Sequence, residues 1–216
     1  NYQVTFPRLR FNFLRQLRAH QYLGLRYWWD NYNISAVQPD GLLEKGNITG
    51  NEGGVISGAG LLYNFDSRDN IFYPTKGFWV EAELFFNQKI LGSTFDFSRW
   101  TLDAVSYTQF STRDVLAVNV WLTAAQGDVP FQQLAFIGGP KKMRGYFEGR
   151  LRDKSLWMAQ VEYRRLLGKR WGAVAFAGIG AVGPKPSDLF AQKTHAVIGT
   201  GLRFRISKKE RVHLRL

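Results

Sequence analysis

The sequence predicts an all-β protein, specifically a transmembrane antiparallel up-and-down β-barrel. Three observations predict it. Apolar and polar residues alternate over long stretches, about ten segments of this kind follow one another, and no apolar run approaches the roughly 20 residues of a membrane-spanning helix. Mean hydropathy is −0.24, which is compatible with a barrel because only alternate side chains face lipid.

The clearest alternation runs from Phe78 to Phe86. Apolar side chains there point to one side, whereas Glu81 and Glu83 point to the other. We expect the two glutamates to face a barrel lumen. Leu84 and Val118 are expected to face lipid, not a dry core between two sheets. The remaining strand candidates are residues 1–16 (bent or at an edge because of Pro7), 20–34, 55–66, 95–111, 116–123, 157–164, 171–183, 196–207 and 212–216.

Strand length separates a barrel from a soluble sandwich. The candidates have roughly 9–16 residues, whereas about 9–11 tilted residues cross a bilayer and soluble strands have about 5–6. The segment 35–54 is polar and glycine-rich and is expected to form a long loop. We expect one partial barrel domain over residues 1–216, with both ends truncated, because each end lies in strand-like sequence and no signal peptide opens the chain.

The chain is basic, with 29 Lys and Arg against 17 Asp and Glu, a net charge of +12. A basic nucleic-acid-binding β-protein is therefore an alternative. The aromatic residues, however, lie on the apolar faces of long strands and not among the cations, so no nucleic acid is expected as a partner. We expect the charge to meet anionic outer-membrane lipids or lipopolysaccharide.

Catalytic and metal motifs are missing from the sequence. There is no cysteine, and the three histidines (His20, His195, His213) show no ligand spacing. No Gly-x-Ser-x-Gly elbow or phosphate loop occurs. The sequence therefore predicts no enzyme, no metal site and no cofactor.

A cationic, glycine-rich stretch lies at residues 138–154, within a predicted loop of about 128–154. Gly138, Gly139, Gly145 and Gly149 allow tight folding, and Met143-Arg144-Gly145-Tyr146 carries one cation and one ring. Two interpretations remain open at this point. The stretch is either a solvated basic hairpin loop or a plug that places the Arg144 guanidinium against a buried carboxylate.

A second segment, residues 66–77, has the composition of a tight turn. Its marked residues are Asp66, Arg68, Asp69, Pro74 and Gly77. Asp69 is expected to cap the turn or to bridge Arg68.

Three passages together resemble the BamA/TamA superfamily of outer-membrane assembly and translocation proteins, also called bacterial surface antigens. They are the turn at 63–77 (Asp-x-Arg-Asp-x-x-x-x-Pro-Thr-x-Gly), the loop with Gly138-Gly139 and Arg144-Gly145-Tyr146, and the order of strands after that loop. The resemblance implies a sixteen-stranded barrel of the bacterial outer membrane, seen here from about its sixth to its fifteenth strand. It also implies that the turn is periplasmic and that the loop enters the lumen.

In that family two lumen-facing carboxylates hold the loop arginine. Glu162 matches the first, and the second is expected within residues 176–180, where Gly178 takes the place of the acid. This departure leaves Arg144 with one strong partner. Whether the Arg144–Glu162 pair only pins the loop or also takes part in gating stays open.

The resemblance implies a protein that assists insertion, assembly or translocation of proteins at the outer membrane. Client outer-membrane proteins, and periplasmic domains or accessory proteins, would be its partners. The alternative is a barrel that anchors or exports a larger protein, for example one fused to a lipase, or a passive pore. An inserted loop would obstruct a solute pore, so a large steady conductance would favour the pore.

Overall fold

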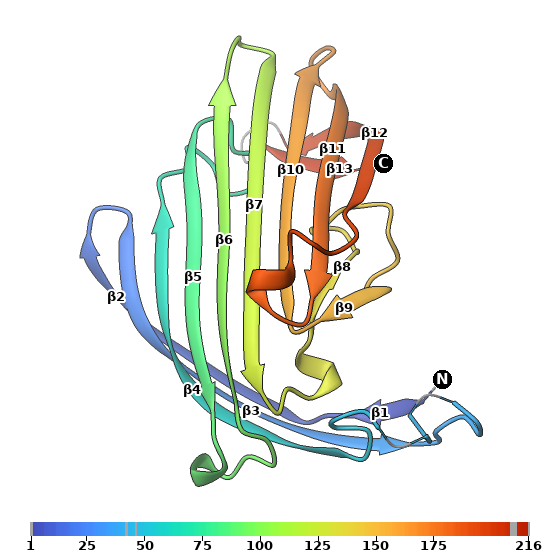
Figure 1. The fold of residues 1–216 in the computed structure, drawn as a ribbon. Helices are drawn as coiled ribbons and strands as arrows, with labels where there is room; N and C mark the ends of the chain where they lie inside the picture. Colours follow the sequence, from blue (N-terminus) through green and yellow to red (C-terminus); the bar gives the residue numbers. More distant parts are fainter. Residues whose placement is uncertain (1, 42, 46, 208–210, 216) are drawn as a thin grey trace.

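The protein is described by a computed structural model over residues 2–41, 43–45, 47–207 and 211–215. One antiparallel sheet dominates it, and three short 3₁₀ helices are the only helices in this part of the chain (Figure 1). The strands are β1 (Gln3–Thr5), β2 (Arg8–Arg18), β3 (Gln21–Ser35), β4 (Gly53–Asp66), β5 (Gly77–Asn87), β6 (Phe97–Gln109), β7 (Asp114–Gly127), β8 (Ala135–Ile137), β9 (Leu151–Asp153), β10 (Ser155–Leu166), β11 (Trp171–Gly183), β12 (His195–Ser207) and β13 (Val212–Arg215). The helices are η1 (Lys89–Leu91), η2 (Phe131–Gln133) and η3 (Pro186–Asp188).

Neighbouring strands of the sheet follow chain order, β3-β4-β5-β6-β7-β10-β11-β12-β13, with β1 and β2 both paired to β3. β1 and β2 form one interrupted strand, because Thr5 pairs with Asn33 and Arg8 with Asp30 in the same register. The interruption contains Pro7, whose carbonyl still accepts a hydrogen bond from Asn31 at 3.1 Å. Proline has no N–H for the ladder, so the predicted strand 1–16 is divided there.

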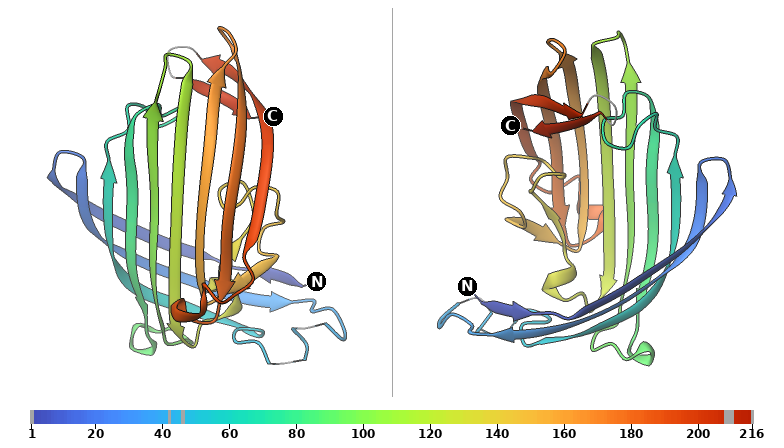
Figure 2. Two further views of the ribbon diagram at one scale, coloured as in Figure 1. Left: turned by 45° about the horizontal axis from the view of Figure 1, so that its top comes forward. Right: turned by 180° about the vertical axis from the view of Figure 1, so that it is seen from behind.

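The sheet is curved, with one convex and one concave face (Figure 2). The convex face is apolar and exposed: Leu84 is 47% and Val118 is 39% accessible. A dry core between two sheets is therefore ruled out at both positions. The prediction of an antiparallel up-and-down sheet of barrel type, with about ten long strands, is confirmed. Within the described residues the sheet is not closed, since β2 and β13 each pair with one neighbour.

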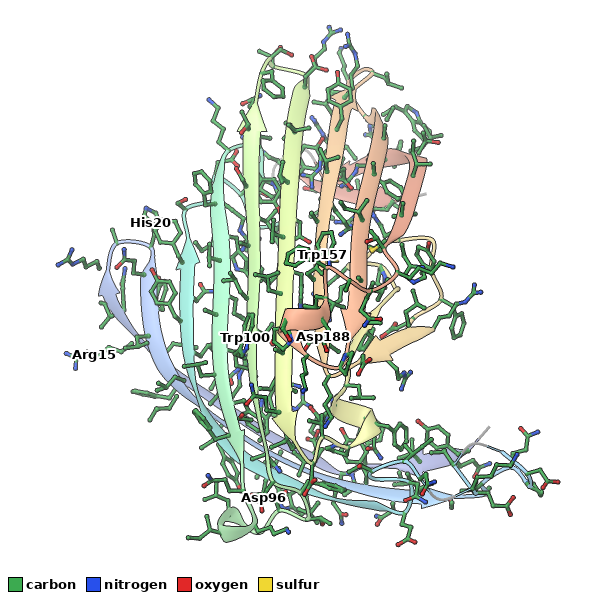
Figure 3. The ribbon with its side chains drawn as sticks, in the orientation of Figure 1. Arg15, His20, Asp96, Trp100, Trp157 and Asp188 are labelled. Carbon is green, nitrogen blue, oxygen red and sulfur yellow. The ribbon has the colours of Figure 1, made fainter. Side chains whose placement is uncertain are left out.

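Most connections at one end of the sheet are short turns, and those at the other end are longer loops. Figure 3 shows His20, in the β2–β3 turn, near one end and Asp96, in the β5–β6 loop, at the other. The His20 carbonyl accepts a hydrogen bond from Asp66 N at 2.9 Å, so the turn after β4 lies at the His20 end. We call this the turn end and the opposite one the loop end. No helix among the described residues is long and apolar enough to cross a membrane.

The concave face carries polar side chains and two buried apolar clusters. One cluster is Tyr32, Ile56, Phe85, Phe95, Phe97, Ala125 and Val129. The other is Ala135, Ile137, Met143, Leu156 and Met158. The second cluster joins β8 and residue 143 of the predicted loop to β10, so the loop packs against the wall of the sheet.

Candidate functional site: the inserted loop and its arginine contacts

The connection between β7 and β10, residues 128–154, folds back along the concave face of the sheet. Figure 2 shows it beside β10, β11 and β12, with the β8–β9 hairpin inside it. Met143 is fully buried, and Ile137 beside it is too. Burying apolar side chains of this size contributes about 1.5–3 kcal/mol each. This burial contradicts the interpretation of the stretch as a solvated hairpin loop.

Backbone geometry explains the glycines of the loop. Gly138, Gly139, Gly145 and Gly149 have φ values of 112°, 84°, 109° and 74°. At Gly138 a Cβ atom would lie 2.3 Å from the Phe147 carbonyl oxygen, so a side chain there would force these two segments of the loop apart. Met143 also has a positive φ, 54°, which is uncommon for a residue with a side chain.

The Gln160 side chain, on β10, binds the backbone of the loop on both sides of Lys142. Its Oε1 accepts a hydrogen bond from Met143 N at 2.8 Å, and its Nε2 donates to the Lys141 carbonyl at 2.8 Å. Farther along the loop, the Tyr146 hydroxyl donates to the Ala196 carbonyl at 2.9 Å. These bonds fix the backbone next to Arg144 and so determine where its guanidinium lies.

Arg144 has two partners, one charged and one aromatic. Its Nη2 donates to Glu162 Oε2 at 2.5 Å, and its Cζ lies 4.0 Å from the centre of the Phe176 ring. Phe176 pairs with Glu162 in the sheet, whereas Gly178 pairs with Gln160. The aromatic face thus lies within residues 176–180, two residues before Gly178, the position at which the resemblance implies a second carboxylate. A cation over such a face contributes about 0.5–2 kcal/mol.

Glu162 is shared by three guanidinium groups. Besides Arg144, its Oε1 accepts from Arg164 Nε at 2.5 Å and from Arg203 Nη2 at 2.6 Å. The side chains of Arg164 and Arg203 are only 8% and 4% accessible. Three cations therefore surround one carboxylate. We call Arg144, Glu162, Arg164 and Arg203 the arginine cluster.

In the turn at residues 66–77, Arg68 pairs with a different acid from the one considered in the sequence analysis. Arg68 is bridged by Asp66, with Nε–Oδ1 and Nη2–Oδ2 distances of 2.8 and 2.6 Å. Of the two expectations for Asp69, the bridge to Arg68 is therefore wrong. Both acids are close to Arg68 in sequence, but only Asp66, at the end of β4, bonds to it. At the end of the turn, a Cβ atom on Gly77 would lie 2.2 Å from the Ser67 carbonyl oxygen.

Asp69 instead caps the turn, which was the other expectation. It accepts hydrogen bonds from Thr75 N at 2.7 Å, Lys76 N at 3.1 Å and the Thr75 hydroxyl at 2.8 Å. Arg211, after β12, donates to it at 2.8 Å. Burial alone would raise the pKa of Asp69, but these bonds outweigh it and lower that pKa to about 2.

The turn also reaches the arginine cluster. The Pro74 carbonyl accepts a hydrogen bond from Arg164 Nη1 at 3.2 Å. The buried Tyr73 ring lies 5.3 Å from Arg164 Cζ and 5.8 Å from Arg203 Cζ, and it stacks on His213 at 4.1 Å. The turn and the loop are thus connected through Glu162 and Arg164, a link that the sequence pattern did not indicate.

A second cluster of the same kind lies on β5. Glu83 pairs with Arg26 and, at 3.0 Å, with Arg99. Arg99 also donates to Gln133, in η2 of the loop, at 2.8 Å. The expectation that Glu83 faces the inner side agrees with these contacts. Alternation alone identifies the face, whereas the arginine partners come from register between strands.

The site offers strong, charge-assisted hydrogen bonds that hold a loop. Within the described residues, no group of three His, Asp or Glu side chains is placed to hold a metal ion.

Comparison with known proteins agrees with this architecture. A model of the Omp85 superfamily domain matches residues 2–207. No curated protein matches the sequence. Among solved structures, the crystal structure of BamA from Haemophilus ducreyi lacking POTRA domains 1-3 is similar, with a TM-score of 0.75 and 13% identity. The match covers 94% of this chain and 49% of that one, so this chain spans about half its length. The chain belongs to the Omp85 superfamily.

Proposed function

We propose that the protein assists the insertion, assembly or translocation of other proteins at the outer membrane, and that its inserted loop, held by Arg144 and Glu162, is required for this. As a member of the Omp85 superfamily, it is a β-barrel protein of the bacterial outer membrane. The observation that carries the proposal is the Arg144–Glu162 contact of 2.5 Å, which fixes the tip of a loop to the inner wall of the sheet.

Two physical features support an assembly role over a passive pore. The loop is held near its start by Arg99–Gln133 and at its tip by Arg144–Glu162, so it occupies space that an open solute channel requires. Long antiparallel strands also suit strand addition, in which an edge of a barrel presents unpaired backbone groups to an incoming strand. Client outer-membrane proteins would be the partners, with periplasmic domains or accessory proteins delivering them. Lipopolysaccharide and anionic lipids would surround the barrel.

The turn at residues 66–77 would face the periplasm in this proposal. Its contact with Arg164, which also binds Glu162, connects that side to the loop. Its contact with Arg211 connects it to the start of β13. A client or a periplasmic domain that moves the turn would then act on the arginine cluster directly. This connection favours the proposal that the Arg144–Glu162 pair takes part in gating by the loop, and does not only pin the loop to the sheet.

The test is an insertion assay with the full-length protein in liposomes. An unfolded outer-membrane protein is added, and its protease-resistant, folded fraction is followed over time. We expect faster insertion with the parent protein than with empty liposomes, and slower insertion with Arg144→Gln. Arg113→Gln, in the exposed β6–β7 turn, is the matched control.

Equal rates with parent protein and empty liposomes would overturn the assembly role. A large, steady conductance of the parent protein without any client would instead identify a pore. Normal insertion by Arg144→Gln would show that the loop contact is not needed for the activity.

A further inference from the structure

We propose that the concave face holds a binding site for a phosphate group, in the cavity lined by the arginine cluster. This site does not depend on the assembly role. The cavity has a volume of about 430 Å³ and lies between the loop, the turn at residues 66–77 and strands β5, β6, β7, β10, β12 and β13. Its charged lining consists of the cations Arg68, Lys141, Arg144, Arg164, Arg203 and Arg215 and the acids Asp103 and Glu162.

The charges of this lining do not balance. Arg68 is neutralised by Asp66, which pairs with it twice. Five cations then remain against two carboxylates, an excess of three positive charges. Lys141 and Arg215 are exposed, so water screens part of this excess, whereas Arg164 and Arg203 are nearly inaccessible. An unpaired charge costs several kcal/mol where it is buried. A bound anion with two negative charges would remove most of the excess.

Arg203 supplies a second, independent indication. Its side chain is 4% accessible, and its Nε–H is buried with no acceptor among the described residues. Its Nη2 is already bonded to Glu162. A buried donor without a partner costs about 1–3 kcal/mol, more for a charged group. The free edge of this guanidinium is therefore a ready donor for an anion.

The chemistry of this lining fits a phosphate group. A guanidinium presents parallel N–H groups that match two phosphate oxygens, and several arginines can share one phosphate. Lys141 adds a cation from the loop, next to the backbone that Gln160 holds. The ligand would be inorganic phosphate or the phosphate of a lipid headgroup, since both carry the same group.

Calorimetry measures binding as each compound is titrated into the purified full-length protein in detergent at neutral pH. The compounds are inorganic phosphate, glycerol phosphate and a short-chain phosphatidic acid, with acetate as the monovalent control. We expect saturable binding of a phosphate compound and weaker binding of acetate. Binding of the lipid alone would assign the site to a headgroup, and binding of all three would assign it to free phosphate as well.

Substitutions that are expected to change the affinity for phosphate in opposite directions make the test specific. Arg203→Gln is expected to weaken phosphate binding about tenfold or more, and Lys141→Gln, which leaves Glu162 untouched, to weaken it less. Asp103→Asn removes a negative charge from the lining and is expected to tighten binding about threefold. Arg113→Gln, outside the cavity, should leave it unchanged. Absence of saturable phosphate binding, or equal affinities in parent protein, Lys141→Gln and Asp103→Asn, would overturn the site.

Discussion

Substitution of Glu162 should release the inserted loop more than substitution of Arg144. Glu162→Gln leaves three guanidinium groups without a carboxylate, two of them nearly inaccessible. Breaking a buried ion pair from one side costs about 3–5 kcal/mol. Arg144→Gln leaves Glu162 with Arg164 and Arg203, and removes one charge-assisted bond and one ring contact of a side chain that is 24% accessible. We therefore expect a cost of about 2 kcal/mol for Arg144→Gln.

The assay uses a buried cysteine as a reporter of loop release. The chain has no cysteine, so Ala135→Cys, 7% accessible in β8 and close in volume, gives a single label site. Its rate of reaction with a maleimide measures how often the loop opens. Relative to Ala135→Cys alone, Arg144→Gln should speed labelling about thirtyfold and Glu162→Gln by about two to four orders of magnitude.

Unchanged labelling in both variants would refute the inference that these contacts hold the loop. A larger effect of Arg144→Gln than of Glu162→Gln would refute the inference that one carboxylate serves three arginines. Arg113→Gln in the same cysteine background controls for loss of a surface charge.

Four further substitutions test the packing of the loop, the turn at residues 66–77 and the orientation of the sheet. Gly180→Val should weaken loop docking by about 1–3 kcal/mol, because a Cβ atom there would lie 2.7 Å from the Trp157 carbonyl oxygen of β10 and 2.9 Å from Met143 Sδ of the loop. Gly168→Val, with no atom within 4 Å, should not change maleimide labelling. Phe176→Leu should speed labelling less than Glu162→Gln, since it removes only the ring under Arg144. Folding lowers the pKa of Asp69 to about 2, so the stability that this carboxylate contributes is present above its unfolded pKa and is lost as the pH falls from about 4 to about 2. Asp69→Asn should remove that part of the pH dependence of the urea midpoint. Identical pH profiles of the two proteins would contradict this prediction. Leu84→Arg, on the convex face, should lower the free energy of unfolding in bilayers by about 2–4 kcal/mol, and Thr101→Arg, on the concave face, should lower it less.

Alternation along the strands was sufficient to predict the sheet. Phe78–Phe86 shows why: a strand with glutamates on one side and large apolar residues on the other has a single way to face lipid and a polar interior. The same pattern separated the apolar side of β10, Val161 and Tyr163, from its polar side. It did not show that Pro7 divides the first strand into β1 and β2. The division depends on the pairing with β3, which determines whether the N–H that proline lacks is needed in the ladder.

The partners of Arg144 were predicted in part. Glu162 came from the family resemblance, whereas Phe176 came only from the structure, which sets it opposite Glu162. Arg203 is 41 residues from Glu162, and only the register of β10, β11 and β12 brings them together. The buried Tyr73 under the cluster was missed for the same reason, since a turn sequence does not show that its tip folds under a neighbouring strand.

The central claim is that the convex face of the sheet meets lipid and the concave face meets water. Its most direct test is spin-label accessibility at two adjacent positions of β7 in lipid bilayers. Val118→Cys and Asn119→Cys place a label on the convex and on the concave face, and Asn119 lines the phosphate cavity. We predict that the label at 118 is accessible to oxygen dissolved in lipid and that the label at 119 is accessible to a water-soluble nickel complex. Equal accessibility of both labels to the nickel complex, or a label at 118 that neither reagent reaches, would contradict the account.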